Sequence, residues 1–182
     1  GIKYLTLYAF STENWKRPKA EIDGLMELLV NTLRQEIKRL TGNHVKLRTI
    51  GETSHLPKDC QQNLEWAIDQ TKNNTGLTLI LALSYSGRWE ILKAARAMAK
   101  DVQEGKIKPE DLNESRFENY LQTSGIPDPE LLIPTSGELR ISNFLLWQIA
   151  YTELYITPTL WPDFRKEHLY EAIWSYQQRE RR

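Results

Sequence analysis

Many of the side chains that could do chemistry gather in one polar loop, residues 10–18, directly after an apolar segment. Its hydroxyl and backbone N–H groups could hold phosphate oxygens, and a following helix would add a favourable dipole. Arg17 could bind an oxyanion through two parallel hydrogen bonds, and Trp15 could pack on an apolar ligand or face a developing cation. A capped loop with a partly buried tryptophan is the alternative that composition leaves open.

A second polar cluster, residues 135–143, contains a glycine that would let the backbone approach a ligand. Arg140 and Ser142 could clamp a phosphate together. A turn followed by a helix N-cap at Ser142 or Asn143 is the alternative. Because both clusters follow strands of the same predicted sheet, together they favour an anion-binding site.

Glu153 interrupts the apolar stretch 144–155, which predicts a buried carboxylate. Such a group is costly unless it is paired or binds a metal. Magnesium takes few protein carboxylates and completes its shell with water and phosphate oxygens, so Glu153 is a candidate ligand. A salt bridge to a neighbouring arginine is the alternative.

Composition and missing signatures exclude several classes of protein. The chain has 182 residues, of which 24 are basic and 24 acidic, so a basic coat for nucleic acid is not expected. Cys60 is the only cysteine, and we interpret it as a structural thiol. The common phosphate-loop, dinucleotide and serine-hydrolase motifs are absent. Because neither a transmembrane-length apolar run nor a signal-peptide pattern occurs, we expect a cytoplasmic protein that can lie at the membrane periphery.

Apolar strands alternate with amphipathic helices along the chain, which predicts one α/β domain, residues 1–182, with a mostly parallel central sheet flanked by helices. Residues 144–151 fit a buried helix or a strand equally well. The predicted strands are 4–10 (a central one), 45–50, 77–83, 131–133 and 154–156, and the predicted helices are 21–40, 58–73, 88–105, 114–122 and 168–179.

In such folds ligands bind beyond the carboxyl ends of the strands. We therefore expect three loops, 11–17, 84–88 and 135–142, to converge on one crevice. Gly1 has no initiator methionine before it and the first predicted strand follows almost at once, so we expect a further strand upstream.

Taken in order, the motifs resemble those of cis-prenyltransferases of the undecaprenyl diphosphate synthase family. The similar segments are YAFSTENWKRP at 8–18, NNTGLTL at 73–79, SYSGRWEI at 84–91, DPELLI at 128–133, TSGE at 135–138, RISNFLLWQ at 140–148 and LWPDF at 160–164. They span nearly the whole chain.

The resemblance implies a Mg²⁺-dependent enzyme that acts as an obligate homodimer. It would condense isopentenyl diphosphate with farnesyl diphosphate into a long-chain cis-polyprenyl diphosphate. The expected product is undecaprenyl diphosphate, the lipid carrier precursor for cell-wall synthesis, delivered to the membrane by a protein without a transmembrane segment.

Site residues carry over by matching position. Glu153 would support the magnesium ion. Asn14 matches the position that the family assigns to the proton acceptor. Because an amide is a poor base, we expect Asn14 to have a positioning or relay role, while the substrate's diphosphate or a carboxylate takes the proton. The substrate site would be lined by Ser11, Thr12, Glu13, Trp15 and Arg17, and isopentenyl diphosphate would be held by Arg140, Ile141 and Ser142.

The resemblance also implies an apolar tunnel for the growing chain. Helix 21–40 carries apolar residues outside its main face, including Leu28 and Val30, and could line the tunnel with Ala9 and Leu77. Core or dimer packing is the alternative for this pattern.

Two features depart from the family. Its Asp-Gly-Asn-Gly-Arg-Trp loop, which supplies the catalytic aspartate, is not in this sequence, and Pro134 stands where the family has an arginine that grips isopentenyl diphosphate. A charge-assisted hydrogen bond is worth about 1.5–3 kcal/mol, so its loss would reduce substrate binding or the reaction rate about ten- to a hundredfold. A non-catalytic partner subunit or an inactive fragment is therefore the alternative function.

Overall fold

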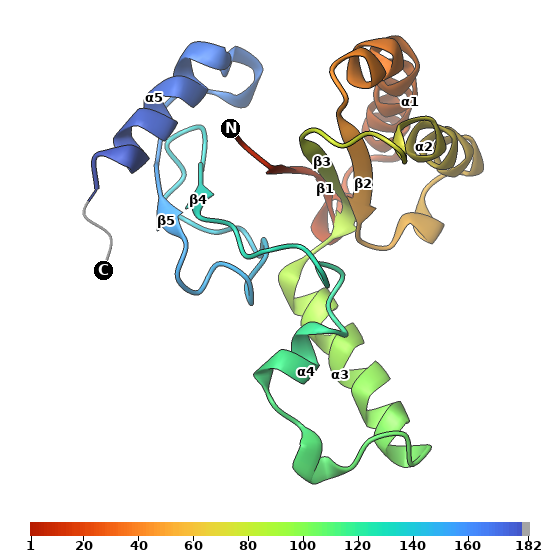
Figure 1. The fold of residues 1–182 in the computed structure, drawn as a ribbon. Coiled ribbons are helices and arrows are strands. Elements are labelled where there is room, and N and C mark those ends of the chain that lie inside the picture. The colour runs from red at the N-terminus through yellow and green to blue at the C-terminus, as the bar shows by residue number, and fades with distance from the viewer. Residues whose placement is uncertain (180–182) are drawn as a thin grey trace. The chain divides into compact units, whose positions relative to one another are not determined.

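The computed structural model describes residues 1–179, and the chain forms two compact units, Gly1–Gln122 and Thr123–Arg182 (Figure 1). The first unit contains a three-stranded parallel sheet in the order β1-β3-β2. Its strands are β1 (Tyr4–Ser11), β2 (Lys46–Ile50) and β3 (Thr78–Tyr85), and its helices are α1 (Lys19–Gly42), α2 (Lys58–Thr71), α3 (Gly87–Gln103) and α4 (Glu114–Glu118).

The second unit is smaller and less regular. Its two short strands, β4 (Leu131–Leu132) and β5 (Glu153–Leu154), pair in parallel, and the helix α5 (Lys166–Gln177) follows them. Within each unit the strands and helices confirm the predicted alternation and the α/β class.

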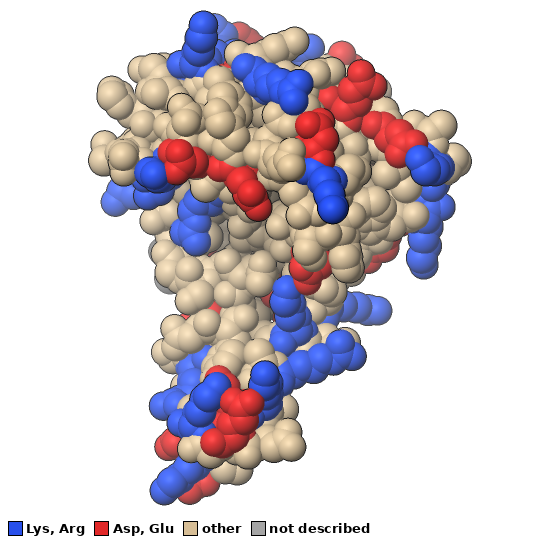
Figure 2. All heavy atoms as spheres, turned by 90° about the vertical axis from the view of Figure 1, so that its right-hand side faces the viewer, with Lys and Arg blue, Asp and Glu red and all other residues tan. Residues whose placement is uncertain are grey.

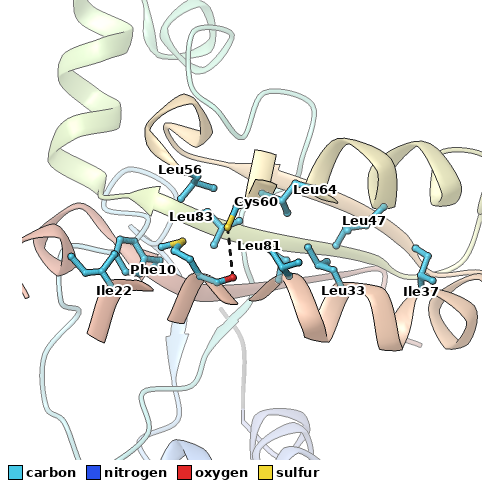
Figure 3. Packing of buried hydrophobic residues seen from close by; sticks show 13 residues of the cluster. Phe10, Ile22, Leu33, Ile37, Leu47, Leu56, Cys60, Leu64, Leu81 and Leu83 are labelled. Carbon is cyan, nitrogen blue, oxygen red and sulfur yellow. Dashed lines mark hydrogen bonds between the residues drawn. The ribbon is translucent and has the colours of Figure 1, made fainter. Parts of the chain in front are cut away.

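Helices α1 and α2 pack on the sheet of the first unit through one apolar cluster (Figure 3). Cys60 lies inside this cluster, where its thiol donates to the carbonyl oxygen of Met26 at 3.6 Å. Burial raises the pKa of the Cys60 thiol, which keeps the sulfur protonated and unreactive, as a structural thiol should be. The buried residues from the helices are Ile22, Met26, Val30, Leu33, Ile37, Cys60, Leu64 and Ala67, and those from the strands are Phe10, Leu47, Leu81 and Leu83.

The ends of these elements follow from local chemistry. Helix α1 ends at Gly42, and the N–H of Asn43 caps it by donating to the carbonyl oxygen of Arg39. Strand β2 stops at Gly51, whose φ is 111°. A Cβ there would lie 2.0 Å from the carbonyl oxygen of Leu83, so only glycine lets the two chains approach this closely.

Several details differ from the sequence-based expectations. Strand β3, not β1, is central within the described residues, because β1 pairs only with β3 there. Val30 belongs to the core, whereas Leu28 is 62% exposed, so the two do not form a second stripe. Strand β3 also continues through Ser84 and Tyr85, which were expected to lie in a loop.

Residues 144–151, which were expected to form a helix or a strand, form turns and irregular structure that continue from Ser142 and Asn143. Ser142, Asn143 and Leu145 have φ values of 54°, 61° and 45°. Residues in the left-handed backbone conformation fit neither a helix nor a strand. The apolar residue types of this segment do not predict that conformation.

The surface carries both charge signs. Figure 2 shows basic and acidic side chains interspersed on the face that it presents, in keeping with the 24 basic and 24 acidic residues of the sequence. Among the described residues, no helix combines the length and the apolarity that a membrane span needs.

Candidate functional site

The first polar loop folds into a short 3₁₀ helix, η1 (Thr12–Lys16), directly after β1. Ser11 caps it: the Ser11 Oγ accepts from the Asn14 N–H at 3.3 Å, and the Asn14 Oδ1 accepts from the Ser11 N–H at 2.8 Å. Because a backbone N–H can only donate, the atom of Asn14 in the cap is the amide oxygen. This orientation turns the Asn14 NH2 group, a hydrogen-bond donor, away from the cap, where it could meet a ligand.

The indole of Trp15 is held from two sides. Its ring meets the buried Phe10 ring edge to face, with centroids 4.9 Å apart, and its Nε1–H donates to the Ser84 Oγ at 2.9 Å. Trp15 as a whole residue is partly exposed. This geometry combines both parts of the expected loop, a capped turn and a fixed aromatic face that a ligand could use.

The charged residues of this loop lie nearer the solvent. The Arg17 Nη1 and the Glu21 Oε1 form an ion pair of 2.7 Å on the first turn of α1, with both side chains about half exposed. The Glu13 Oε2 lies 3.2 Å from the Thr12 hydroxyl oxygen. An anion that binds Arg17 must therefore compete with Glu21.

The second predicted loop meets the first through side chains. The Thr12 hydroxyl donates to the Ser86 Oγ at 2.8 Å, beside the bond from Trp15 to Ser84. Both serines are almost fully buried. Two of the three loops that were expected to converge therefore do so within the first unit.

A buried carboxylate lies behind this junction, on the first turn of α3. Glu90 is 1% exposed; its Oε2 accepts from the Tyr85 hydroxyl at 2.5 Å and its Oε1 from the Gln122 N–H at 2.8 Å. The Gln122 side chain in turn accepts from the Gly51 N–H at 3.3 Å. Glu90 thus ties the end of β3 to the last residue of the first unit.

Tyr8 joins the same region and gives it a pH dependence. Its hydroxyl donates to the Tyr85 carbonyl oxygen at 3.1 Å, and burial, assisted by the nearby charge of Glu13, raises the pKa of Tyr8 from 10.0 to about 12. The folded chain therefore holds this proton more tightly than the unfolded chain. The resulting stability is full below pH 10 and is lost as the pH rises towards 12.

We expect Tyr8→Phe to flatten this alkaline loss. Between pH 9 and pH 11.5 the unfolding free energy of the variant should fall by about 1 kcal/mol less than that of the wild type, after allowance for solvent screening. Urea unfolding at each pH measures this difference. Parallel curves for the two proteins would show that Tyr8 does not titrate differently in the folded state.

The third predicted loop lies in the second unit, so its convergence with the first two stays a prediction. Its backbone is anchored: the Ser136 N–H donates to the Thr159 carbonyl oxygen at 2.8 Å, and the Gly137 N–H donates to the Thr157 carbonyl oxygen at 2.9 Å. No helix begins at Ser142 or Asn143, so the helix-cap alternative for this loop is wrong.

The predicted diphosphate-binding residues of this loop are accessible. Arg140, Ile141 and Ser142 are exposed, and the Arg140 Nε pairs with the Glu138 Oε2 at 2.7 Å. Accessible side chains can reach a ligand, and the ion pair places a carboxylate where a phosphate oxygen would have to bind.

Glu153 forms the salt bridge that was the alternative to metal binding. Its Oε2 lies 2.6 Å from the Arg179 Nη1, and the Arg179 Nη2 donates to the Leu154 carbonyl oxygen at 3.0 Å. The Glu153 side chain is 28% exposed, so the expectation of a buried carboxylate is wrong. Among residues 1–179 no group of three or more potential metal-ligating side chains forms a cluster.

Sequence reasoning missed several residues that support these loops. Ser84 and Ser86 were placed in a loop without a role, and Glu90, Glu138 and Arg179 were not singled out. Serines and surface charges carry no distinctive spacing. The one available signal was Glu90, an acidic residue at the start of the helix that follows the most apolar strand, where a buried carboxylate would need partners.

Comparison with solved structures defines the class of protein. The chain matches lavandulyl diphosphate synthase from Lavandula x intermedia, in a structure with dimethylallyl diphosphate, with a TM-score of 0.96 and 41% identity over 100% of this chain and 79% of that one. It also matches a probable undecaprenyl diphosphate synthase from Campylobacter jejuni, with a TM-score of 0.86 and 38% identity over 99% and 82% of the two chains. The fold is that of the cis-prenyltransferases.

Sequence comparison defines the family. A family model described as "Putative undecaprenyl diphosphate synthase" matches residues 1–182. Isoprenyl transferases from Clostridium tetani and Porphyromonas gingivalis are 57% and 52% identical over the whole chain, which covers 71% and 72% of their lengths. The chain therefore belongs to the undecaprenyl diphosphate synthase family of prenyltransferases, which confirms the resemblance.

Proposed function

We propose that this protein condenses isopentenyl diphosphate with an allylic prenyl diphosphate, farnesyl diphosphate, to make a long-chain cis-polyprenyl diphosphate. The product would be undecaprenyl diphosphate, the lipid carrier precursor for cell-wall synthesis. The observation that carries the proposal is the fixed first loop. Its Trp15 and Thr12 are hydrogen-bonded to buried serines in a chain that is 57% identical to an isoprenyl transferase.

The first loop, 11–17, and the third loop, 135–142, would each bind one of the two substrates. The first loop would receive the allylic substrate, with the Trp15 face against its apolar part and Arg17 near its diphosphate. The third loop would hold isopentenyl diphosphate. The residues in these roles are Ser11, Thr12, Glu13, Trp15 and Arg17 in the first loop, and Arg140, Ile141 and Ser142 in the third.

In the reaction the allylic C–O bond breaks and the diphosphate leaves with the electron pair. The terminal alkene carbon of isopentenyl diphosphate bonds to the allylic carbon, and loss of a proton sets the new double bond. Arginine side chains stabilise the negative charge of the leaving group. The Asn14 NH2 group is a donor, so Asn14 would orient a phosphate oxygen, and the proton would pass to a diphosphate or a carboxylate.

We propose Glu153 as a ligand of Mg²⁺. This ion uses one or two protein carboxylates and completes its shell with water and phosphate oxygens, so one half-buried carboxylate fits it without a cluster of acids. When bound, the ion would neutralise charge on the diphosphate. Glu153 must first exchange its partner, because Arg179 holds it at 2.6 Å.

Arg179→Ala should strengthen metal binding. Removal of the competing guanidinium frees the Glu153 carboxylate, and an exposed ion pair is worth up to about 1 kcal/mol, which corresponds to about fivefold in affinity. Titration with Mn²⁺ followed by electron paramagnetic resonance measures the affinity without turnover. Arg165→Ala is the matched control because it removes the same charge from the second unit without touching Glu153. Equal affinities in the two variants would contradict the competition.

We also propose that the protein acts as a homodimer, in the cytoplasm and at the membrane periphery. Several large apolar side chains of the second unit are exposed, among them Trp161 at 57% and Trp174 at 66%. Aromatic side chains are enriched at protein interfaces, so this surface is suited to a second copy. The net charge of zero gives no support for nucleic acid as a partner.

An incorporation assay on the full-length gene product tests the reaction. Radiolabelled isopentenyl diphosphate, farnesyl diphosphate and Mg²⁺ should yield a labelled, butanol-extractable polyprenyl product whose chain length chromatography measures. The non-catalytic partner subunit is the second candidate, and Pro134 is the observation that favours it. A full-length protein that binds both substrates and incorporates no label would establish that alternative.

A further inference from the structure

Three consecutive residues, Ser84 and Tyr85 at the end of β3 and Ser86 directly after it, hold the first polar loop and the strand that leads into it. The Ser84 Oγ accepts from the Trp15 indole, the Tyr85 carbonyl oxygen accepts from the Tyr8 hydroxyl, and the Ser86 Oγ accepts from the Thr12 hydroxyl. Ser84 and Ser86 are 1% and 2% exposed. Buried polar groups are retained where they have partners, and these partners belong to the loop that carries Trp15.

Ser84 has an unusual backbone. Its φ is 50°, in the left-handed region that side chains other than glycine, asparagine and aspartate seldom occupy. Such a conformation costs about 1–2 kcal/mol for a residue with a Cβ. Glycine would avoid that cost, but it has no hydroxyl for the indole. A strained, buried serine at the end of a strand that borders a candidate site points to a role for its side chain.

We propose that Ser84 is a positioning residue for Trp15. Its buried hydroxyl fixes the rotation of the indole, which also packs edge to face with Phe10, so that the aromatic ring is set before a substrate arrives. The entropy cost of fixing the Trp15 side chain then arises when the chain folds and not when the substrate binds. This inference rests on the proposed function in one respect, namely that the Trp15 face receives the apolar part of the allylic substrate.

The decisive variant is Ser84→Gly. It removes the hydroxyl and suits the left-handed backbone, so it should fold. Ser86→Ala is the matched control: it removes a buried hydroxyl two residues away, at an extended position with φ of −157°, and leaves the Trp15 contact in place. Trp15→Phe removes the indole N–H and identifies its resonance.

The first measurement needs no turnover. In a ¹H–¹⁵N spectrum of the full-length protein labelled at tryptophan, the Trp15 Nε1–H signal is the one that Trp15→Phe removes. We expect it to move upfield and to exchange with solvent at least several-fold faster in Ser84→Gly, and to stay in place in Ser86→Ala. An unmoved signal in Ser84→Gly overturns the proposed contact.

The second measurement joins the contact to the substrate. A neutral hydrogen bond contributes about 0.5–1.5 kcal/mol, so the affinity of Ser84→Gly for farnesyl thiodiphosphate, an unreactive analogue, should fall about two- to tenfold. The KM for farnesyl diphosphate should rise by the same factor, with little change in the KM for isopentenyl diphosphate. The double variant Ser84→Gly/Trp15→Phe should bind no worse than Trp15→Phe alone, because both changes break one interaction.

These results separate the two proposals. A shifted indole signal with unchanged allylic affinity overturns the positioning role while leaving the reaction intact. Additive losses in the double variant do the same. A wild-type protein that neither binds the analogue nor incorporates label overturns the proposed function, and the indole signal then still decides whether Ser84 fixes Trp15.

Discussion

Arg140→Ala is expected to lower kcat/KM for isopentenyl diphosphate by about ten- to a hundredfold. The guanidinium is exposed on the third loop, and the charge-assisted hydrogen bonds that it would make to a diphosphate are worth about 1.5–3 kcal/mol. The kcat/KM of Arg140→Lys should lie between the values for the wild type and Arg140→Ala, since lysine keeps the charge and loses the planar pair of donors. Steady-state kinetics with varied isopentenyl diphosphate measures the effect.

Glu138 provides the control for this prediction. It pairs with Arg140 at 2.7 Å, so Glu138→Gln removes the competing charge while the arginine stays. We expect an unchanged or modestly lower KM for isopentenyl diphosphate in Glu138→Gln. Similar losses in Arg140→Ala and Glu138→Gln would mean that the ion pair matters for the shape of the loop and that Arg140 does not bind the substrate.

Pro134→Arg is expected to raise kcat/KM for isopentenyl diphosphate by about ten- to a hundredfold, the reverse of the cost of one charge-assisted hydrogen bond. The Pro134 carbonyl oxygen already accepts from the Thr157 N–H at 3.1 Å, so the backbone stays anchored when the side chain changes. A new guanidinium would then begin from a fixed position two residues after β4. Initial rates of label incorporation at low isopentenyl diphosphate concentration measure the gain.

Two further variants test the cause of any gain. Pro134→Ala removes the ring without adding charge, and Pro134→Lys adds charge without the guanidinium fork. We expect no gain from alanine and a smaller one from lysine. A gain in Pro134→Ala equal to that in Pro134→Arg would assign the effect to the rigid ring, and no gain in any variant would show that position 134 lies away from the substrate.

The long helices and strands of the first unit could be predicted from the sequence because burial of one face makes apolar residues recur at a regular spacing. Helix α1 was predicted from apolar residues at helical spacing, and the structure extends it by two residues at each end, to Lys19 and Gly42. The error at Val30 has a simple origin. A helix of 24 residues that packs on both a sheet and α2 buries a face wider than one stripe.

The irregular segments could not be read in this way. The left-handed conformations at Ser136, Ser142 and Leu145 depend on tertiary contacts that no local pattern encodes. The meeting of the first two predicted loops, 11–17 and 84–88, could be predicted because chain direction in a parallel sheet fixes which ends meet. The contacts of Ser84 and Ser86 were missed because a serine looks the same in the sequence whether its hydroxyl meets water or another side chain.

Three of the charged groups assigned to the substrates and the metal share one arrangement, in which each already holds an opposite charge of the same chain. Arg17 holds Glu21, Arg140 holds Glu138 and Glu153 holds Arg179, at 2.6–2.7 Å in all three pairs. Ligand binding is therefore an ion exchange and not a simple neutralisation. Added salt weakens the internal pairs together with the contacts to the ligand, so affinity should depend on ionic strength less steeply than the number of charges suggests.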